Sequence, residues 1–114
     1  MKIFNALLAT CVLACSSTAM AENVWKTQTN IEGVQALHDG SYILYLPLGT
    51  DSTCNEGGKL FRVAENQNQV TQEGARNLLT VALVAYTSKK KVSVLYDNGS
   101  ASCYVQQIHL RNDS

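Results

Sequence analysis

Cysteine and histidine have the widest chemistry of the residue types in this chain, because both can bind metals and take part in catalysis. Cys54 and Cys103 lack the C-x-x-C spacing of a redox or zinc motif, and a zinc site would need His38 and His109 to converge with them. We therefore predict a structural disulfide between Cys54 and Cys103, with no metal site and no cofactor. Closing a loop of about 50 residues is worth roughly 4 kcal/mol in the chain-entropy model.

Few residues of the chain could support hydrolysis. A nucleophile needs a base within hydrogen-bond distance, and His38 and His109 are the only histidines. Both lie in segments that we expect to be extended, and the sequence contains neither H-E-x-x-H nor G-x-S-x-G. We therefore expect a protein that is not an enzyme, with a small hydrolase as the least favoured alternative.

The first 21 residues have the pattern of a bacterial export signal. Lys2 precedes an apolar run, and Ala19-Met20-Ala21 supplies a small-x-small cleavage site. We predict cleavage after Ala21, which leaves a mature domain of residues 22–114 in the periplasm or outside the cell. The predicted cleavage also removes two of the four cysteines, so that only Cys54 and Cys103 remain.

A second interpretation of the leader gives a lipoprotein. Val12-Leu13-Ala14-Cys15 resembles a lipobox, in which the cysteine is lipidated and becomes the new N-terminus. Cleavage before Cys15 would tether the domain to a membrane, whereas cleavage after Ala21 would release it. The downstream Ala-Met-Ala site favours release.

The mature chain has the size of one small domain and a nearly balanced charge. Without Lys2 it carries eight basic and nine acidic side chains, a net charge of −1. Nucleic acids and anionic membranes select strongly basic surfaces, so we expect neither as a partner. The only basic run, Lys89-Lys90-Lys91, follows a predicted helix, where cations favour the negative end of the helix dipole.

The clearest periodic signal predicts a helix over residues 72–88, with Thr71 as its N-cap. Apolar residues recur there at helical spacing, which places them on one stripe facing the core: Ala75, Leu78, Leu79, Ala82, Leu83 and Tyr86.

The remaining segments alternate with the period of β-strands. Asp39-Gly40 predicts a tight hairpin between the first two strands, and Gly33 is a candidate bulge. The predicted strands cover 25–38, 41–46, 59–65, 92–96 and 103–110, and the last places Cys103, Val105, Gln107 and His109 on one face. This order predicts a mainly β (α+β) fold, a five-stranded antiparallel OB-fold-like barrel with one helix between strands three and four. A five-stranded α+β sandwich is the alternative.

The layout resembles that of the small secreted OB-fold proteins of Gram-negative bacteria. The shared features are an early tryptophan strand, a cysteine before strand three, one amphipathic helix, the segment Lys-Lys-Val-Ser-Val-Leu-Tyr and a cysteine-bearing last hairpin. That group includes the B subunits of AB5 toxins of the subtilase cytotoxin and pertussis-like branch. The resemblance implies a non-catalytic binding module that recognises cell-surface glycans, and a pentamer if the chain is toxin-like. None of the family's sugar-contacting residues can be matched to a position here.

Aromatic side chains are the candidates for a binding surface, because they stack on sugars and anchor protein contacts. We expect Trp25, Tyr42 and Tyr45 to form this surface, with a protein or a glycan as the partner. The alternative function is that of a periplasmic inhibitor, immunity or accessory protein that acts through one protein interface.

Overall fold

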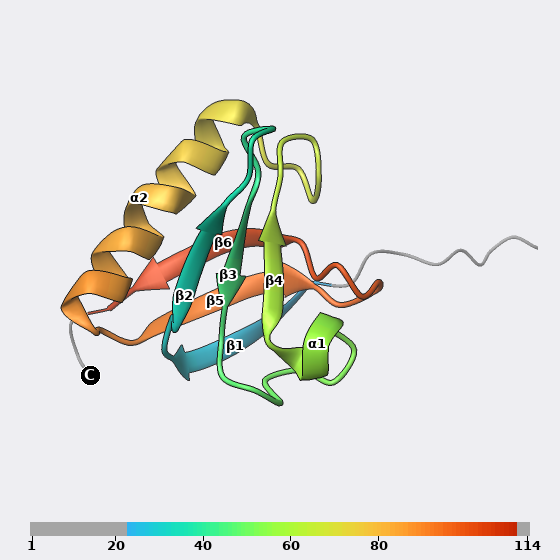
Figure 1. Cartoon of the computed structure of the whole chain (residues 1–114), viewed down its shortest axis with the longest axis vertical. Coiled ribbons are helices and arrows are strands. Elements are labelled where there is room, and N and C mark those ends of the chain that lie inside the picture. Colours follow the sequence, from blue (N-terminus) through green and yellow to red (C-terminus); the bar gives the residue numbers. More distant parts are fainter. Residues whose placement is uncertain (1–22, 112–114) are drawn as a thin grey trace, which may run out of the picture.

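The computed structural model describes residues 23–111, which form two three-stranded antiparallel sheets and a long helix (Figure 1). The first sheet has the order β1 (Asn23–Thr29), β5 (Val92–Asp97) and β6 (Val105–Leu110). The second has the order β2 (Gly33–Ala36), β3 (Tyr42–Tyr45) and β4 (Leu60–Val63). Helix α2 (Gln72–Ser88) connects β4 to β5, and a single turn, α1 (Asn55–Gly58), precedes β4. The predicted leader, including Ala21 and Cys15, lies outside the described residues.

The prediction of a mainly β fold is confirmed, whereas the prediction of a five-stranded barrel is wrong. The described part of the chain has six strands in two sheets, and these do not close into a barrel. The difference arises because the predicted first strand is two strands. Its β1 part pairs with β5, and its β2 part pairs with β3.

The break between β1 and β2 has a local cause. Gln28 adopts a positive φ of 54°, and the pairing register of β1 with β5 shifts between Lys26 and Thr29. This bulge turns Thr29 inward, and Ile31 in the following connection is also buried. The chain thus changes sheets after Thr29, and the irregularity lies five residues before the predicted bulge at Gly33.

The hairpin between β2 and β3 forms as predicted, and its turn is held by a side chain. The Asp39 carboxylate accepts hydrogen bonds from the Ser41 backbone N–H at 3.0 Å and from the Ser41 hydroxyl at 2.6 Å. Gly40 takes a φ of 92°, which favours glycine. At the other end of the hairpin, Gly33 lies opposite Tyr45 in the ladder.

Helix α2 has the predicted bounds and the predicted cap, because its ends are encoded locally. The Thr71 hydroxyl accepts a hydrogen bond from the Gly74 N–H at 2.9 Å, which satisfies one of the free N–H groups of the first turn. Lys89 ends the helix in the left-handed conformation, and its N–H donates to Ala85 O.

The side of α2 that faces the core differs from the predicted stripe. The buried residues are Ala75, Ala82 and Ala85, while Leu78 and Leu79 are half-buried against the core. Leu83 and Tyr86 are each 42 % exposed, so their prediction as core residues is wrong. The helix packs through alanine side chains together with Leu78 and Leu79, and it leaves Leu83, Val84 and Tyr86 exposed.

The two sheets are linked where β4 passes the start of β6. Arg62 and Tyr104 form an isolated parallel bridge, and the Arg62 N–H donates to Cys103 O at 3.3 Å. The predicted Cys54–Cys103 disulfide is confirmed next to this bridge, with Cα atoms 5.7 Å apart. It joins the loop before β4 to the segment that leads into β6.

Candidate functional site

Tyr42 is a core residue, which corrects its prediction as part of a binding surface. Its side chain is only 2 % exposed, and its hydroxyl donates a hydrogen bond to Ala75 O at 2.7 Å. Burial raises the pKa of the Tyr42 hydroxyl. Tyr42 therefore fixes α2 against β3.

Tyr45 is half-buried and has a local structural role. An added Cβ on Gly33 would lie 3.3 Å from the Tyr45 ring, which shows how closely the ring covers this glycine. The Tyr45 hydroxyl donates to the side-chain oxygen of Gln35 at 2.5 Å. Tyr45 thus packs across the β2–β3 hairpin, on a different sheet from Trp25.

Of the three aromatic residues predicted to form a binding surface, Trp25 is the most exposed. Its side chain is 48 % exposed, while its neighbour Val24 packs against the core. In the first sheet, Trp25 lies opposite Leu95, and Leu95 lies opposite Gln107. These three residues form a row across the sheet, which we call the Trp25 face. It combines a flat aromatic ring, an aliphatic side chain and an exposed amide.

The two histidines are exposed and lie on different elements. His38 precedes the β2–β3 turn, and His109 lies on β6 opposite Ser93. Neither has a side-chain hydrogen bond to another described residue. Within residues 23–111, no three His, Cys, Asp or Glu side chains are grouped so that they could hold a metal ion.

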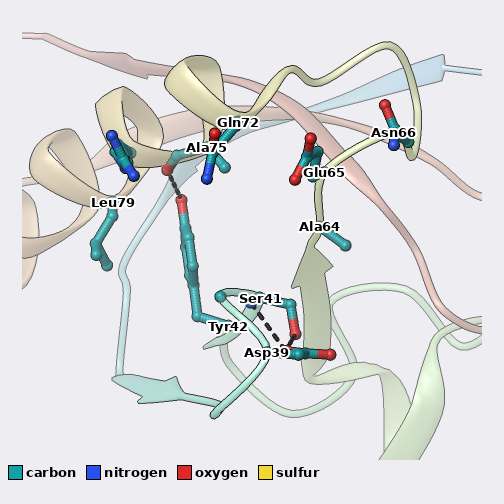
Figure 2. A pocket seen from close by; sticks show the side chains of 11 residues that line it. Asp39, Ser41, Tyr42, Ala64, Glu65, Asn66, Gln72, Ala75 and Leu79 are labelled. Atoms are coloured by element: carbon teal, nitrogen blue, oxygen red, sulfur yellow. Dashed lines mark hydrogen bonds between the residues drawn. The ribbon is translucent and has the colours of Figure 1, made fainter.

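The sequence interpretation missed a pocket between the β2–β3 turn, the loop after β4 and the first turns of α2 (Figure 2). We call it the turn–helix pocket. Its volume is about 350 Å³, within the usual range for small-molecule sites. Tyr42, Ala75 and Leu79 provide its apolar lining.

The polar lining of the turn–helix pocket comes from three separate segments. Asp39 and Ser41 belong to the turn, Glu65 to the loop, and Gln72 and Arg76 to the helix. Figure 2 shows the two dashed hydrogen bonds that hold Asp39 and Ser41 together. Among the described residues, the side chains of Glu65, Gln72 and Arg76 make no hydrogen bond or ion pair. These polar groups are therefore available to a ligand.

The charged groups of the pocket are the carboxylates of Asp39 and Glu65 and the guanidinium of Arg76. Hydrogen bonds from the Ser41 hydroxyl and then the Ser41 N–H lower the pKa of Asp39, so that it is ionised at neutral pH. Both bonds from Ser41 end on Oδ1 of Asp39. Gln72 and Arg76 lie four residues apart and so share one side of α2. This spacing was the only sequence signal for the pocket.

Apolar side chains are also exposed on the C-terminal half of α2. Leu83, Val84 and Tyr86 are the exposed large hydrophobic residues of this helix. A hollow of about 450 Å³ lies beside Tyr86, between the end of α2 and the connection from β1 to β2. We call Leu83, Val84 and Tyr86 the α2 apolar patch.

Comparison with the models of protein families finds no family that matches this chain, and comparison with curated proteins finds no significant similarity. The disulfide is typical of proteins outside the reducing cytoplasm. No helix in the described part of the chain is sufficiently long and apolar to cross a membrane.

Proposed function

We propose that this protein is an exported, non-catalytic binding module that holds a glycan or a protein against its Trp25 face. The observation that carries the proposal is the half-exposed Trp25 ring in one row with Leu95 and Gln107. An aromatic ring beside an amide offers both a stacking surface and hydrogen bonds, as binding sites for sugars and for peptides require.

The proposed compartment is the periplasm or the cell exterior. The disulfide supports it, because such bonds persist in oxidising compartments. Intact mass of the mature protein tests the leader: release predicts a chain that begins at Glu22, whereas a lipidated N-terminus at Cys15 would contradict it.

An OB-fold-like connectivity is also part of this proposal. β1 and β2 are separated by only residues 30–32, so they can be regarded as one bent strand that pairs with both β5 and β3. The parallel bridge between Arg62 and Tyr104 then joins β4 to the segment entering β6. The helix follows β4, as it follows the third strand of an OB-fold.

A glycan array with labelled protein tests the binding function. The informative variant is Trp25→Ala, and Tyr86→Ala is its matched control, because Tyr86 is a similarly exposed aromatic residue on α2. We expect Trp25→Ala to abolish the binding that the native protein and Tyr86→Ala share. Equal binding by both variants would contradict a role for the Trp25 face.

The assembly state is tested by measuring the mass in solution. A toxin-like module would form a pentamer, so light scattering should give five times the chain mass. A strict monomer that binds no sugar on the array would contradict the toxin-like form of the proposal.

The second candidate function is an inhibitor or accessory protein that acts through one protein interface. The α2 apolar patch favours it, because neighbouring exposed apolar side chains are typical of interaction sites. This function predicts that one stoichiometric partner is recovered from periplasmic extract. In that experiment, Tyr86→Ala should fail to recover the partner, whereas Trp25→Ala should recover it as the native protein does. On the glycan array, the expected effects of the two substitutions are the opposite.

A further inference from the structure

We propose that the turn–helix pocket is a binding site for a small, uncharged, hydroxyl-rich ligand of the saccharide type. The pocket and the Trp25 face share no residues. This proposal is therefore independent of whether the Trp25 face binds a ligand.

The hydrogen-bonding groups of the pocket define the ligand class. The carboxylates of Asp39 and Glu65 are hydrogen-bond acceptors, and the guanidinium of Arg76 can only donate hydrogen bonds. A ligand that satisfies all three must both donate and accept hydrogen bonds. Hydroxyl groups do both, and a saccharide carries several of them on one ring.

The charges of the same groups disfavour simple anions and simple cations. An anionic ligand would lie near two carboxylates, and a cationic ligand would lie near Arg76. A wholly apolar ligand would remove water from these polar groups without replacing its hydrogen bonds, which is costly. An uncharged polar ligand meets none of these penalties.

The pocket is also organised before a ligand arrives. The two hydrogen bonds from Ser41 to Oδ1 hold the Asp39 carboxylate in place. Tyr42 is held in place by its bond to Ala75 O, so it forms a fixed part of the lining. A ligand therefore has to order few side chains on this side of the pocket, which lowers the entropic cost of binding.

The size of the pocket limits the ligand. A volume of about 350 Å³ is near the lower end of the range for small-molecule sites, roughly 300 to 1,000 Å³. The pocket thus suits a short saccharide or the terminal unit of a longer one.

The test is a titration of the full chain, purified with its disulfide formed, followed by amide and Arg Nε–H NMR signals. The probes are glucose, galactose and N-acetylglucosamine as neutral sugars, glucuronate as an anionic sugar and glucosamine as a cationic one. We expect at least one neutral sugar to shift the signals of Gly40, Ser41, Asn66 and Arg76. Glucuronate and glucosamine should bind about tenfold more weakly or worse.

Variants with the same substitution identify the site. Glu65→Ala should weaken binding of the neutral sugar about tenfold, because it removes a charged acceptor. Glu73→Ala is the matched control, since Glu73 is also exposed, lies on the first turn of α2 and does not line the pocket. It should bind as the native protein does.

Each of the following results would overturn the proposal. The first is that no neutral sugar shifts the pocket signals, and the second is that glucuronate or glucosamine binds as tightly as the neutral sugars. The third is equal binding by Glu65→Ala and Glu73→Ala. A neutral sugar that shifts only the Trp25 indole signal also overturns this proposal, while it supports the function proposed for the Trp25 face.

Discussion

Tyr96 and Asp51 join β5 to the loop before β4 through a hydrogen bond of 2.6 Å from the tyrosine hydroxyl to the carboxylate. The Tyr96 ring meets Phe61 edge to face, with ring centroids 4.8 Å apart. Asp51 also accepts hydrogen bonds from the Thr53 N–H and hydroxyl. One side chain of the first sheet therefore holds both the core of the second sheet and the loop that carries Cys54.

Tyr96→Phe is expected to lower the free energy of unfolding by about 1 kcal/mol, less than the roughly 1.5 to 3 kcal/mol of hydrogen bonds to charged groups, because Asp51 is partly exposed. The substitution keeps the ring against Phe61 and removes only the hydroxyl. Urea denaturation measures the loss. Tyr86→Phe is the control and should change stability by less than about 0.5 kcal/mol, because Tyr86 is an exposed surface residue. An equal loss in both variants would show that the bond to Asp51 contributes nothing.

The same carboxylate predicts how stability depends on pH. Burial alone would raise the pKa of Asp51, but hydrogen bonds from Thr53, Tyr96 and Asn98 outweigh it, and the net pKa is lowered. A carboxyl group with a lowered folded pKa stabilises the fold above its unfolded pKa, about 3.9 for Asp, and this stability is lost as pH falls through the folded pKa. Asp51→Asn should therefore be less stable than the native protein at neutral pH, and the gap should narrow below about pH 4.

Thermal unfolding across this pH range measures the gap between the two proteins. A difference that stays constant from neutral to acid pH would mean that ionisation of Asp51 does not contribute to stability. The pKa of Asp39 is also lowered. Because Asp39 is present in both proteins, its contribution to the pH dependence cancels when their stabilities are compared.

The disulfide should account for a large part of the stability of this small domain. Its cysteines are 49 residues apart in sequence, and the chain-entropy model gives about 4 kcal/mol for a loop of this length, with typical measured values of 2 to 4 kcal/mol. The double variant Cys54→Ala, Cys103→Ala should lose an amount in that range by urea denaturation. Adding reductant to the native protein should reproduce the loss and leave the double variant unchanged. A loss below about 1 kcal/mol would contradict this role.

Features encoded by neighbouring residues could be predicted from the sequence. Helix α2 has its predicted bounds because Thr71 caps it and Lys89 ends it. The β2–β3 hairpin follows from Asp39 and Gly40, and the disulfide follows from the two cysteines that remain after the predicted leader.

Features that depend on contacts between distant segments could not be predicted. The alternation around Tyr42 does not reveal its burial, because residues 41–44 are all buried and β3 is the central strand of its sheet. The division of the first strand has a local cause, the bulge at Gln28, but the sequence has no glycine there to mark it. The turn–helix pocket combines segments that contain Asp39, Glu65 and Arg76, so it exists only after the hairpin packs beside α2.

Gly40 and Gly58 have similar positive φ angles but different surroundings, so alanine substitutions at the two positions distinguish backbone strain from steric clash. Gly40 has a φ of +92° and no heavy atom within 4 Å of a built Cβ, while Gly58 has a φ of +85° and a Cβ that would lie 2.4 Å from Asp51 O. Gly40→Ala should therefore cost only the left-handed backbone strain, roughly 1 to 2 kcal/mol. Gly58→Ala adds a clash with backbone that cannot move without disturbing the loop that carries Asp51 and Cys54.

We expect Gly58→Ala to be the more destabilised of the two by at least about 1 kcal/mol, since overpacking a close contact typically costs 1 to 3 kcal/mol. Urea denaturation of both variants with the disulfide intact measures the difference. The Asp51 N–H donates to Gly58 O at 3.3 Å, so the amide signal of Asp51 should shift in Gly58→Ala and stay in place in Gly40→Ala. Equal stabilities of the two variants would contradict this prediction. They would mean that the backbone of the loop before β4 shifts to accommodate the added methyl group at little cost in free energy.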